Sequence, residues 1–193
     1  MGYVIAIAGK GGTGKTTIAA LIVRLLKENQ RGSILAVDAD PNSNLGEALG
    51  VNLENSVGKI LDGISANPQS VPAGMPKERF IEYELQQAIA EGEGFDLLAM
   101  GKPEGPGCYC YVNNCLRGLM ARLSADYDYL VIDNEAGLEH LSRRTARSAD
   151  TLLVVSAAFR PTGVASETTS RVSALRAVRR DKCSSPASLS ITR

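Results

Sequence analysis

A glycine-rich segment near the N-terminus carries residues suited to phosphate chemistry. Gly9-Lys-Gly-Gly-Thr-Gly-Lys-Thr-Thr17 directly follows an apolar run and fits the pattern G-x-x-x-x-G-K-[ST]. Glycines allow backbone N–H groups to curve around phosphate oxygens, and the start of a helix adds positive potential. In this pattern Lys15 contacts the β- and γ-phosphates, and the Thr16 hydroxyl coordinates Mg²⁺. The segment predicts a site for ATP or ADP and Mg²⁺, built from Gly9, Lys10, Gly11, Gly12, Thr13, Gly14, Lys15, Thr16 and Thr17.

A second lysine inside the loop, Lys10, makes the motif more specific. The segment from Lys10 to Thr17 resembles the deviant Walker A motif of the ATPase family that contains MinD, ParA, the arsenite-pump ATPase and the nitrogenase iron protein. The resemblance implies that Lys10 reaches across a homodimer interface to the partner's nucleotide. A cation supplied in this way stabilises charge in the transition state, as an arginine finger does.

Two aspartate-containing segments fit the same resemblance. Asp38-Ala-Asp40-Pro41 leaves one apolar run, where the family has a switch segment that orients water and senses the γ-phosphate. The match implies that Asp40 polarises the attacking water and that Asp38 is a switch or Mg²⁺-side residue. Asp133-Asn-Glu-Ala-Gly137 leaves another run, so Asp133 is expected to hold the Mg²⁺ shell and Gly137 to offer its N–H to the γ-phosphate. The predicted catalytic residues are Lys10, Lys15 and Asp40.

A pair of cysteines, Cys108 and Cys110, predicts a metal site. They are too close for an unstrained disulfide, and two thiolates do not complete the four-coordinate site that a soft metal prefers. The missing ligands come either from elsewhere in the chain or from a second copy. A two-fold axis through this segment would place four cysteines around one Ni²⁺ or Zn²⁺ ion.

The other cysteines and the single histidine have less defined roles. Cys115 falls one helical turn into an expected helix, where a small apolar core residue is the favoured interpretation. Cys183 lies near the C-terminal end, and no role is assigned to it. His140 has the chemistry of a nickel ligand, but its place after the second switch favours a structural or relay role.

The motifs together narrow the resemblance. The deviant P-loop, Asp38–Pro41, Gly105-Pro-Gly-Cys-Tyr-Cys110 and Asp133-Asn-Glu-Ala-Gly-Leu-Glu-His-Leu141 resemble the CooC-type nickel-insertion accessory ATPases of carbon monoxide dehydrogenase. The resemblance covers roughly residues 1–175. It implies an ATP-dependent dimer whose shared cysteines bind nickel or zinc, with carbon monoxide dehydrogenase as the client.

Two other functions use the same P-loop chemistry. A ParA- or MinD-like positioning ATPase would need a basic DNA-facing surface or an amphipathic membrane helix. The segment from Arg171 to Lys182 is basic, but its apolar residues are expected to pack on the sheet. An iron–sulfur ATPase like the nitrogenase iron protein would need a second cysteine in the later switch region, and none is evident there.

The elements expected to position these residues form an α/β fold of the P-loop NTPase type, with a mostly parallel sheet flanked by helices. Apolar runs separated by helical stretches predict the buried strands Tyr3–Ala8, Ser33–Val37, Phe95–Ala99, Tyr129–Ile132 and Thr151–Val155. Helices are expected at 15–29, 78–91, 114–124, 138–148 and 164–180. Residues 50–77 contain several prolines and predict a loop with a short helix.

Composition sets the remaining expectations. The 193 residues carry 21 basic and 21 acidic side chains, and this zero net charge argues against nucleic acid and anionic membranes as partners. No apolar run approaches the roughly 20 residues of a membrane span, and no basic leader is present, so a cytoplasmic protein is expected. Residues 1–181 are predicted to form one ATPase domain and 182–193 an atypical tail. The expected helix at 164–180 should lead into another strand, and none is evident after it, so we expect the C-terminal end to be truncated or altered. Either change would weaken recognition of the nucleotide base.

Overall fold

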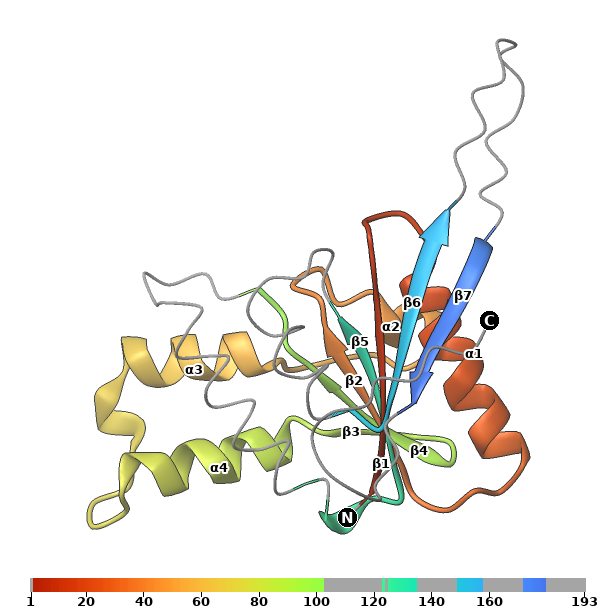
Figure 1. Ribbon diagram of the computed structural model, residues 1–193. Helices are drawn as coiled ribbons and strands as arrows, with labels where there is room; N and C mark the ends of the chain where they lie inside the picture. Colours follow the sequence, from red (N-terminus) through yellow and green to blue (C-terminus); the bar gives the residue numbers. More distant parts are fainter. Residues whose placement is uncertain (1, 103–122, 124, 135–148, 158–171, 180–193) are drawn as a thin grey trace, which may run out of the picture.

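The computed structural model describes residues 2–102, 123, 125–134, 149–157 and 172–179, and a mixed sheet runs through them (Figure 1). Its seven strands have the order β3-β4-β2-β5-β1-β6-β7. The five inner strands are parallel: β1 (Tyr3–Gly9), β2 (Ile34–Ala39), β4 (Phe95–Ala99), β5 (Tyr129–Asn134) and β6 (Thr151–Ala157). The two edge strands, β3 (Ala90–Gly92) and β7 (Val172–Arg179), are antiparallel to their neighbours.

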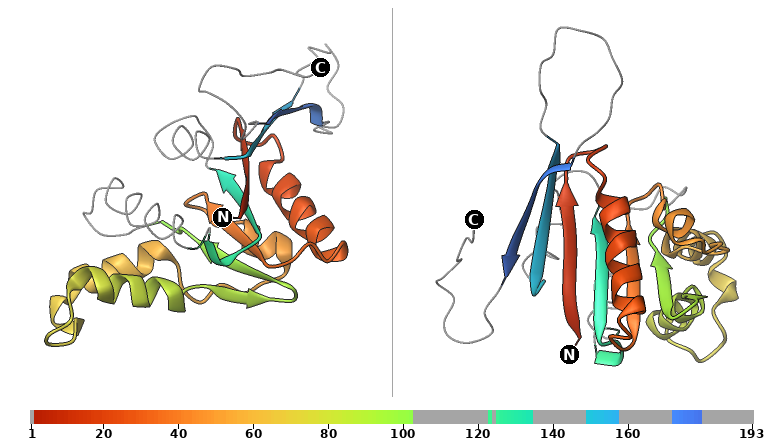
Figure 2. Two further views of the ribbon diagram at one scale, coloured as in Figure 1. Left: turned by 60° about the horizontal axis from the view of Figure 1, so that its bottom comes forward. Right: turned by 90° about the vertical axis from the view of Figure 1, so that its right-hand side faces the viewer.

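Helices cover both faces of the sheet. On one face, α1 (Lys15–Glu28) and the short α2 (Leu45–Leu49) pack over the central strands (Figure 2). On the other face, α3 (Val57–Ala66) and α4 (Lys77–Gln87) lie side by side, joined through the 3₁₀ turn η1 (Pro68–Ser70) (Figure 1).

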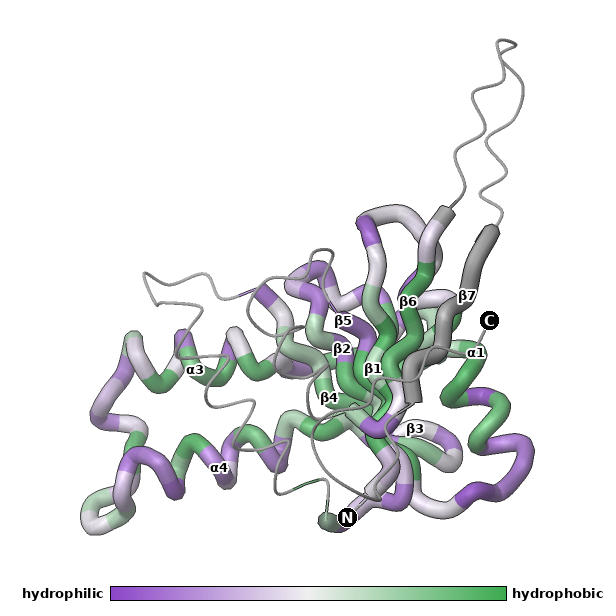
Figure 3. Tube along the Cα trace, viewed as in Figure 1, coloured by the Kyte–Doolittle hydropathy of each residue, from purple (hydrophilic) through white to green (hydrophobic). Residues whose placement is uncertain are grey.

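Strand β2 shows why the sheet needs two helical layers. Leu35 and Val37 belong to the core under α3 and α4, whereas Ile34 and Ala36 belong to the core under α1. Successive side chains of a strand point to opposite faces, so a strand that is apolar at successive positions, as β2 is from Ile34 to Val37, must be covered on both sides. The inner strands are accordingly hydrophobic along much of their length (Figure 3).

Parallel pairing brings the predicted functional segments to one edge. The carboxyl ends of parallel strands lie together, so the last residues of β5 meet the residues that follow β1, β2 and β4 there. The register pairs Asp38 of β2 with Asp133 of β5, and Ile7 of β1 pairs with Asp133 on the other side. The α/β P-loop fold and all five expected strands are confirmed, but β6 is not fully buried, since Val154 and Ser156 are exposed.

The helix expected at 164–180 is wrong over residues 172–179, because these form strand β7. Residues 164–171 lie outside the described residues. Apolar residues three apart, Val172, Leu175 and Val178, suit a helix, but the valines also suit a strand. The outer edge of β6 decides between them. Its unpaired N–H and C=O groups bond to β7 in an antiparallel ladder, with a register shift at Ser156 and Ala157.

Two other expectations were correct only in part. The helix expected at 78–91 ends at Gln87, since residues 90–92 form β3 and turn back through Gly94, whose φ is +80°. Residues 50–77 hold the ten-residue helix α3 in addition to a turn. The expected helix 15–29 is confirmed as α1.

Several predictions fall on other parts of the chain. The expected helix at 138–148 lies outside the described residues, as does the one at 114–124 apart from Leu123. The expected tail, residues 182–193, also lies outside them. Within the described part of the chain, no helix combines the length and apolar character needed to cross a membrane.

Leu35→Ala tests the two-sided core. The side chain is fully buried in β2, so its truncation is expected to lower the free energy of unfolding by about 2–5 kcal/mol. Leu25→Ala on α1 is the matched control, because that side chain is 57% exposed, and it should change stability by less than about 1 kcal/mol. Urea unfolding measures both. Equal effects of the two variants would contradict this packing.

Candidate functional site

The P-loop joins β1 to α1 through a turn that only small residues can follow. Gly12 and Gly14 have φ values of +75° and +89°, in the left-handed region that favours glycine. At Gly9, an added Cβ would lie 2.3 Å from the carbonyl oxygen of Val155, so the close approach of β6 also requires glycine there. The Thr13 hydroxyl donates to the carbonyl oxygen of Lys10 at 2.7 Å and closes the turn.

The first turn of α1 presents free backbone donors. Gly14 is the N-cap residue, and no side chain of the described residues caps this end of the helix. The first N–H groups of a helix lack partners within the helix and carry its positive end, so they favour an anion. The loop therefore has the geometry of a phosphate cradle.

Lys15 is a buried cation at the start of that helix. Its exposure is only 7%, and no carboxylate among the described residues lies within ion-pair distance of its ammonium group. A buried charge without a paired counter-ion is costly, so the position favours a bound anion. Lys10, by contrast, is exposed at the rim of the loop.

Asp133 lies beneath the loop at the end of β5. It is 1% exposed, and its Oδ2 accepts a hydrogen bond from the Thr16 hydroxyl at 2.6 Å. Burial raises the pKa of Asp133, whereas the Thr16 bond and the nearby charge of Lys15 oppose that rise. Its other oxygen, Oδ1, is buried and has no hydrogen-bond partner in the described part of the chain.

That unpartnered oxygen fits a magnesium ion. Mg²⁺ takes oxygen ligands and usually binds through one or two protein groups, phosphate oxygens and water. Thr16 and Asp133 supply a hydroxyl and a carboxylate side by side. No three His, Cys, Asp or Glu side chains among the described residues gather into a metal cluster, so an ion held here would also need the phosphates.

Asp38 organises the turn that follows β2. It is fully buried, with Oδ1 accepting from the Asp40 N–H at 3.1 Å and Oδ2 from the Leu45 N–H at 2.8 Å. Burial raises the pKa of Asp38 to about 6, although these two hydrogen bonds act in the opposite direction. Repulsion from Asp133 and Asp40 adds to the rise. Asp38 therefore fixes the backbone from Asp40 to the start of α2.

Asp40 is half-buried at the start of this turn. Its Oδ1 accepts hydrogen bonds from the backbone and side-chain N–H groups of Asn42, at 2.9 and 3.0 Å. The predicted P-loop residues, Asp38, Asp40 and Asp133 thus lie at the same edge of the sheet. Six other predicted or considered residues lie outside the described ones: Cys108, Cys110, Cys115, Gly137, His140 and Cys183.

Two polar residues at this edge were not predicted from the sequence. Asn134 is 1% exposed and donates from Nδ2 to the carbonyl oxygen of Ile7 at 2.8 Å. Its Oδ1 has no partner among the described residues. Ser43 lies in the turn after Asp40, with a φ of +50°. Asn134 was detectable as a polar residue ending an apolar strand, whereas Ser43 has no comparable sequence signal.

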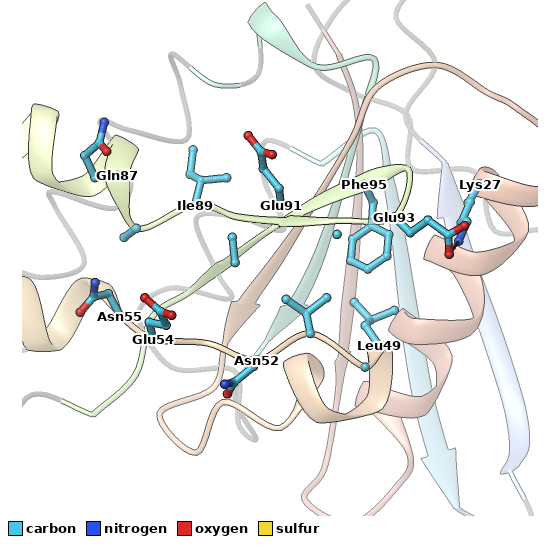
Figure 4. Close-up of a pocket in the computed structure, with 15 residues that line it drawn as sticks. Lys27, Leu49, Asn52, Glu54, Asn55, Gln87, Ile89, Glu91, Glu93 and Phe95 are labelled. Atoms are coloured by element: carbon cyan, nitrogen blue, oxygen red, sulfur yellow. Dashed lines mark hydrogen bonds and ion pairs between the residues drawn. The ribbon is translucent and has the colours of Figure 1, made fainter.

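A cavity of about 550 Å³ lies elsewhere in the molecule (Figure 4). It is bordered by the β3–β4 hairpin and by the ends of α1, α2 and α4. Its rim includes the ion pair between Lys27 and Glu93, at 2.9 Å. Three strands separate β3 from β1 in the sheet, so this cavity is distinct from the P-loop site.

Comparison with known proteins agrees with the fold and the loop. A family model described as an AAA domain matches residues 2–173. The chain belongs to this family of P-loop ATPases. The chain is of the ParA and MinD type within this family. The solved structure of the septum site-determining protein MinD from Pyrococcus horikoshii, complexed with Mg-ADP, superimposes with a TM-score of 0.54 and 27% identity. That match covers 80% of this ATPase and 57% of the MinD chain.

Two curated relatives are also similar to this ATPase. An uncharacterized ATP-binding protein of Methanocaldococcus jannaschii is 47% identical over 154 residues, which cover 79% of this chain and 60% of the relative. The carbon monoxide dehydrogenase accessory protein CooC of Rhodospirillum rubrum is 32% identical over 169 residues, covering 78% and 61%. The chain thus spans about three-fifths of the length of these relatives.

Asp38 is expected to make the stability of the folded chain depend on pH. Its pKa is raised in the folded state, so the folded protein binds more protons than the unfolded chain between about pH 4 and pH 6. Stability contributed by this residue should fall by about 3 kcal/mol as pH rises through that window, then level off. In Asp38→Asn this contribution is absent.

The measurement is urea unfolding of both proteins from about pH 4 to pH 7. The stability of the wild type relative to Asp38→Asn should decrease through that range. Asp128→Asn is a suitable control, because the Asp128 carboxylate is exposed and its pKa is lowered by bonds from Ser33. If the difference in the free energy of unfolding between the wild type and Asp38→Asn stays constant with pH, the raised pKa of Asp38 is contradicted.

Proposed function

We propose that the chain is a Mg²⁺-dependent ATPase whose nucleotide cycle controls the binding of nickel or zinc for a client enzyme. The observation that supports the ATPase part is an Asp133 oxygen that has no partner among the described residues and lies beside the Thr16 hydroxyl. It lies directly below the start of α1, which no described side chain caps and where Lys15 is buried. One arrangement thus offers a cation site next to an anion site, which is what a magnesium–nucleotide complex requires.

Each residue of the site has a defined task in this proposal. Lys15 and the N–H groups of the loop bind the β- and γ-phosphates, while Thr16 and Asp133 hold the metal. Mg²⁺ bound there would neutralise charge on the phosphate oxygens. Asp40 orients the attacking water, and Asp38 keeps Asp40 in place through the bond to its N–H at 3.1 Å.

Two further groups complete the proposed site. Lys10 is exposed at the rim of the loop, so it is free to reach the nucleotide of a second copy and stabilise transition-state charge there. Gly137 follows β5 in the sequence and offers its N–H to the γ-phosphate. This assignment makes the active unit a homodimer.

The metal part of the proposal rests on sequence. Cys108 and Cys110 follow β4 in the chain, and the CooC protein of Rhodospirillum rubrum is among the relatives. Nickel or zinc would be the cargo, held by Cys108 and Cys110 of both copies in a four-thiolate site. The proposed client is carbon monoxide dehydrogenase. Because linkage is reciprocal, nucleotide that favours the dimer must also favour the shared metal.

Metal stoichiometry is the test of this proposal. The purified chain is dialysed against Ni²⁺ or Zn²⁺, with and without Mg²⁺ and a non-hydrolysable ATP analogue, and the bound metal is counted. One ion per two chains is expected, with tighter binding in the presence of nucleotide. Cys108→Ala should abolish the binding, whereas Cys183→Ala, as the control cysteine, should retain it.

Other outcomes would contradict the proposal. One ion per chain that survives Cys108→Ala would exclude the shared site. Salt-sensitive binding to DNA, or binding to anionic liposomes, would instead support a ParA- or MinD-like positioning ATPase. A brown iron–sulfur chromophore after anaerobic purification would support the third alternative.

A further inference from the structure

The turn after β2 is held in a conformation that its sequence does not favour. Ser43 has a φ of +50°, in the left-handed region where a residue with a Cβ is disfavoured. Its backbone N–H donates to the carbonyl oxygen of Asp40 at 3.0 Å. Such conformations persist only where surrounding contacts determine them, and they concentrate at functional sites.

The Ser43 hydroxyl connects two chain segments. It donates to the carbonyl oxygen of Asp40 at 3.4 Å and accepts from the backbone N–H of Gly101 at 3.2 Å. Gly101 lies just beyond β4, seven positions before Cys108 in the sequence. One hydroxyl thus joins the proposed water-orienting residue to the start of the segment that carries the cysteines.

Backbone contacts hold the end of β4 between two elements. The Met100 N–H donates to the carbonyl oxygen of Asp38 at 2.8 Å, and the Met100 carbonyl accepts from the N–H of Gly58, at the start of α3, also at 2.8 Å. At Gly101, which has a φ of +63°, an added Cβ would lie 2.2 Å from the Ser56 hydroxyl oxygen. Gly101 is therefore closely packed and has little freedom on the α3 side.

This packing limits how Gly101 can respond to a movement of Asp40. If nucleotide repositions the turn from Asp40 to Ser43, the bond from Ser43 to Gly101 must either break or carry Gly101 along. The Ser56 side chain, whose hydroxyl caps α3 by accepting from the Lys59 N–H at 3.3 Å, limits the movement of Gly101 toward α3. The bond from Ser43 to Gly101 is therefore the contact through which a movement of Asp40 would reach the end of β4.

We propose that Ser43 is a positioning residue that transmits nucleotide occupancy from Asp40 to Gly101 and so to the cysteine segment after β4. The inference rests on the proposed function, because it assigns the route by which nucleotide and metal affect each other. It requires the Ser43 hydroxyl itself and not only a suitable backbone at position 43.

Amide hydrogen exchange at residues 97–102 tests the inference without any metal. In the wild type, Mg-ADP is expected to change the exchange rate of the Gly101 amide by about threefold or more, the effect of making or losing one hydrogen bond. In Ser43→Ala the change should fall below about twofold, because the acceptor is gone. The temperature of unfolding and the amount of bound ADP are measured on the same samples.

Two further variants separate the hydroxyl from the backbone. Ser43→Gly also lacks the hydroxyl but accepts the left-handed conformation without strain, so it should lose the nucleotide response as Ser43→Ala does. Ser70→Ala is the control, since the exposed Ser70 hydroxyl donates to the nearby carbonyl of Asn67 and to no other group among the described residues. This variant should respond like the wild type. A nucleotide response retained in Ser43→Gly would overturn the inference.

A second readout links this inference to the metal. Zn²⁺ affinity is measured with and without Mg-ADP, and the nucleotide dependence seen in the wild type should be lost in Ser43→Ala. If the wild type binds nucleotide but no metal, the proposed cargo role fails while the exchange data still decide the role of Ser43. If nucleotide binds and the Gly101 amide does not respond in the wild type, the inference fails and the proposed function stands. If no nucleotide binds, both fail.

Discussion

The hydrogen bond from Thr16 to Asp133 is the contact on which the site depends. It joins the first turn of α1 to the end of the central strand β5, at 2.6 Å, with the carboxylate almost fully buried. A buried carboxylate with one satisfied oxygen is an expensive feature unless a cation completes it. The same bond that orients Asp133 also ties the helix start to the sheet, so it links the phosphate cradle to the cation position.

Parallel pairing explains why the acidic residues lie so close together. Asp38 and Asp133 are register partners on adjacent strands, and their repulsion contributes to the raised pKa of Asp38. The nearby charge of Lys15 partly opposes the rise that burial causes in the pKa of Asp133. Backbone N–H groups stabilise the Asp38 carboxylate. Polar groups thus gather where strands end. The apolar residues of β2, which point alternately into the two cores, support them from below.

The inner sheet and the P-loop were predictable because their signals are local. A strand buried on both faces is continuously apolar, and the glycine spacing before Lys15 has a direct geometric meaning. The edge strands were not predictable, since β7 depends on the open edge of β6 rather than on its own residues. Ser43 could not be found from sequence either, because contacts distant in the chain, at Gly101, accompany its left-handed backbone.

The magnesium dependence of nucleotide affinity tests the central claim most directly. Calorimetric titration with ADP, in Mg²⁺ and in EDTA, should show at least about tenfold tighter binding with Mg²⁺ in the wild type, equivalent to about 1.4 kcal/mol. In Asp133→Asn that ratio should approach one, whereas Asp128→Asn, at the other end of β5, should keep it. An Asp133→Asn protein that is folded and retains the full magnesium effect would contradict the account.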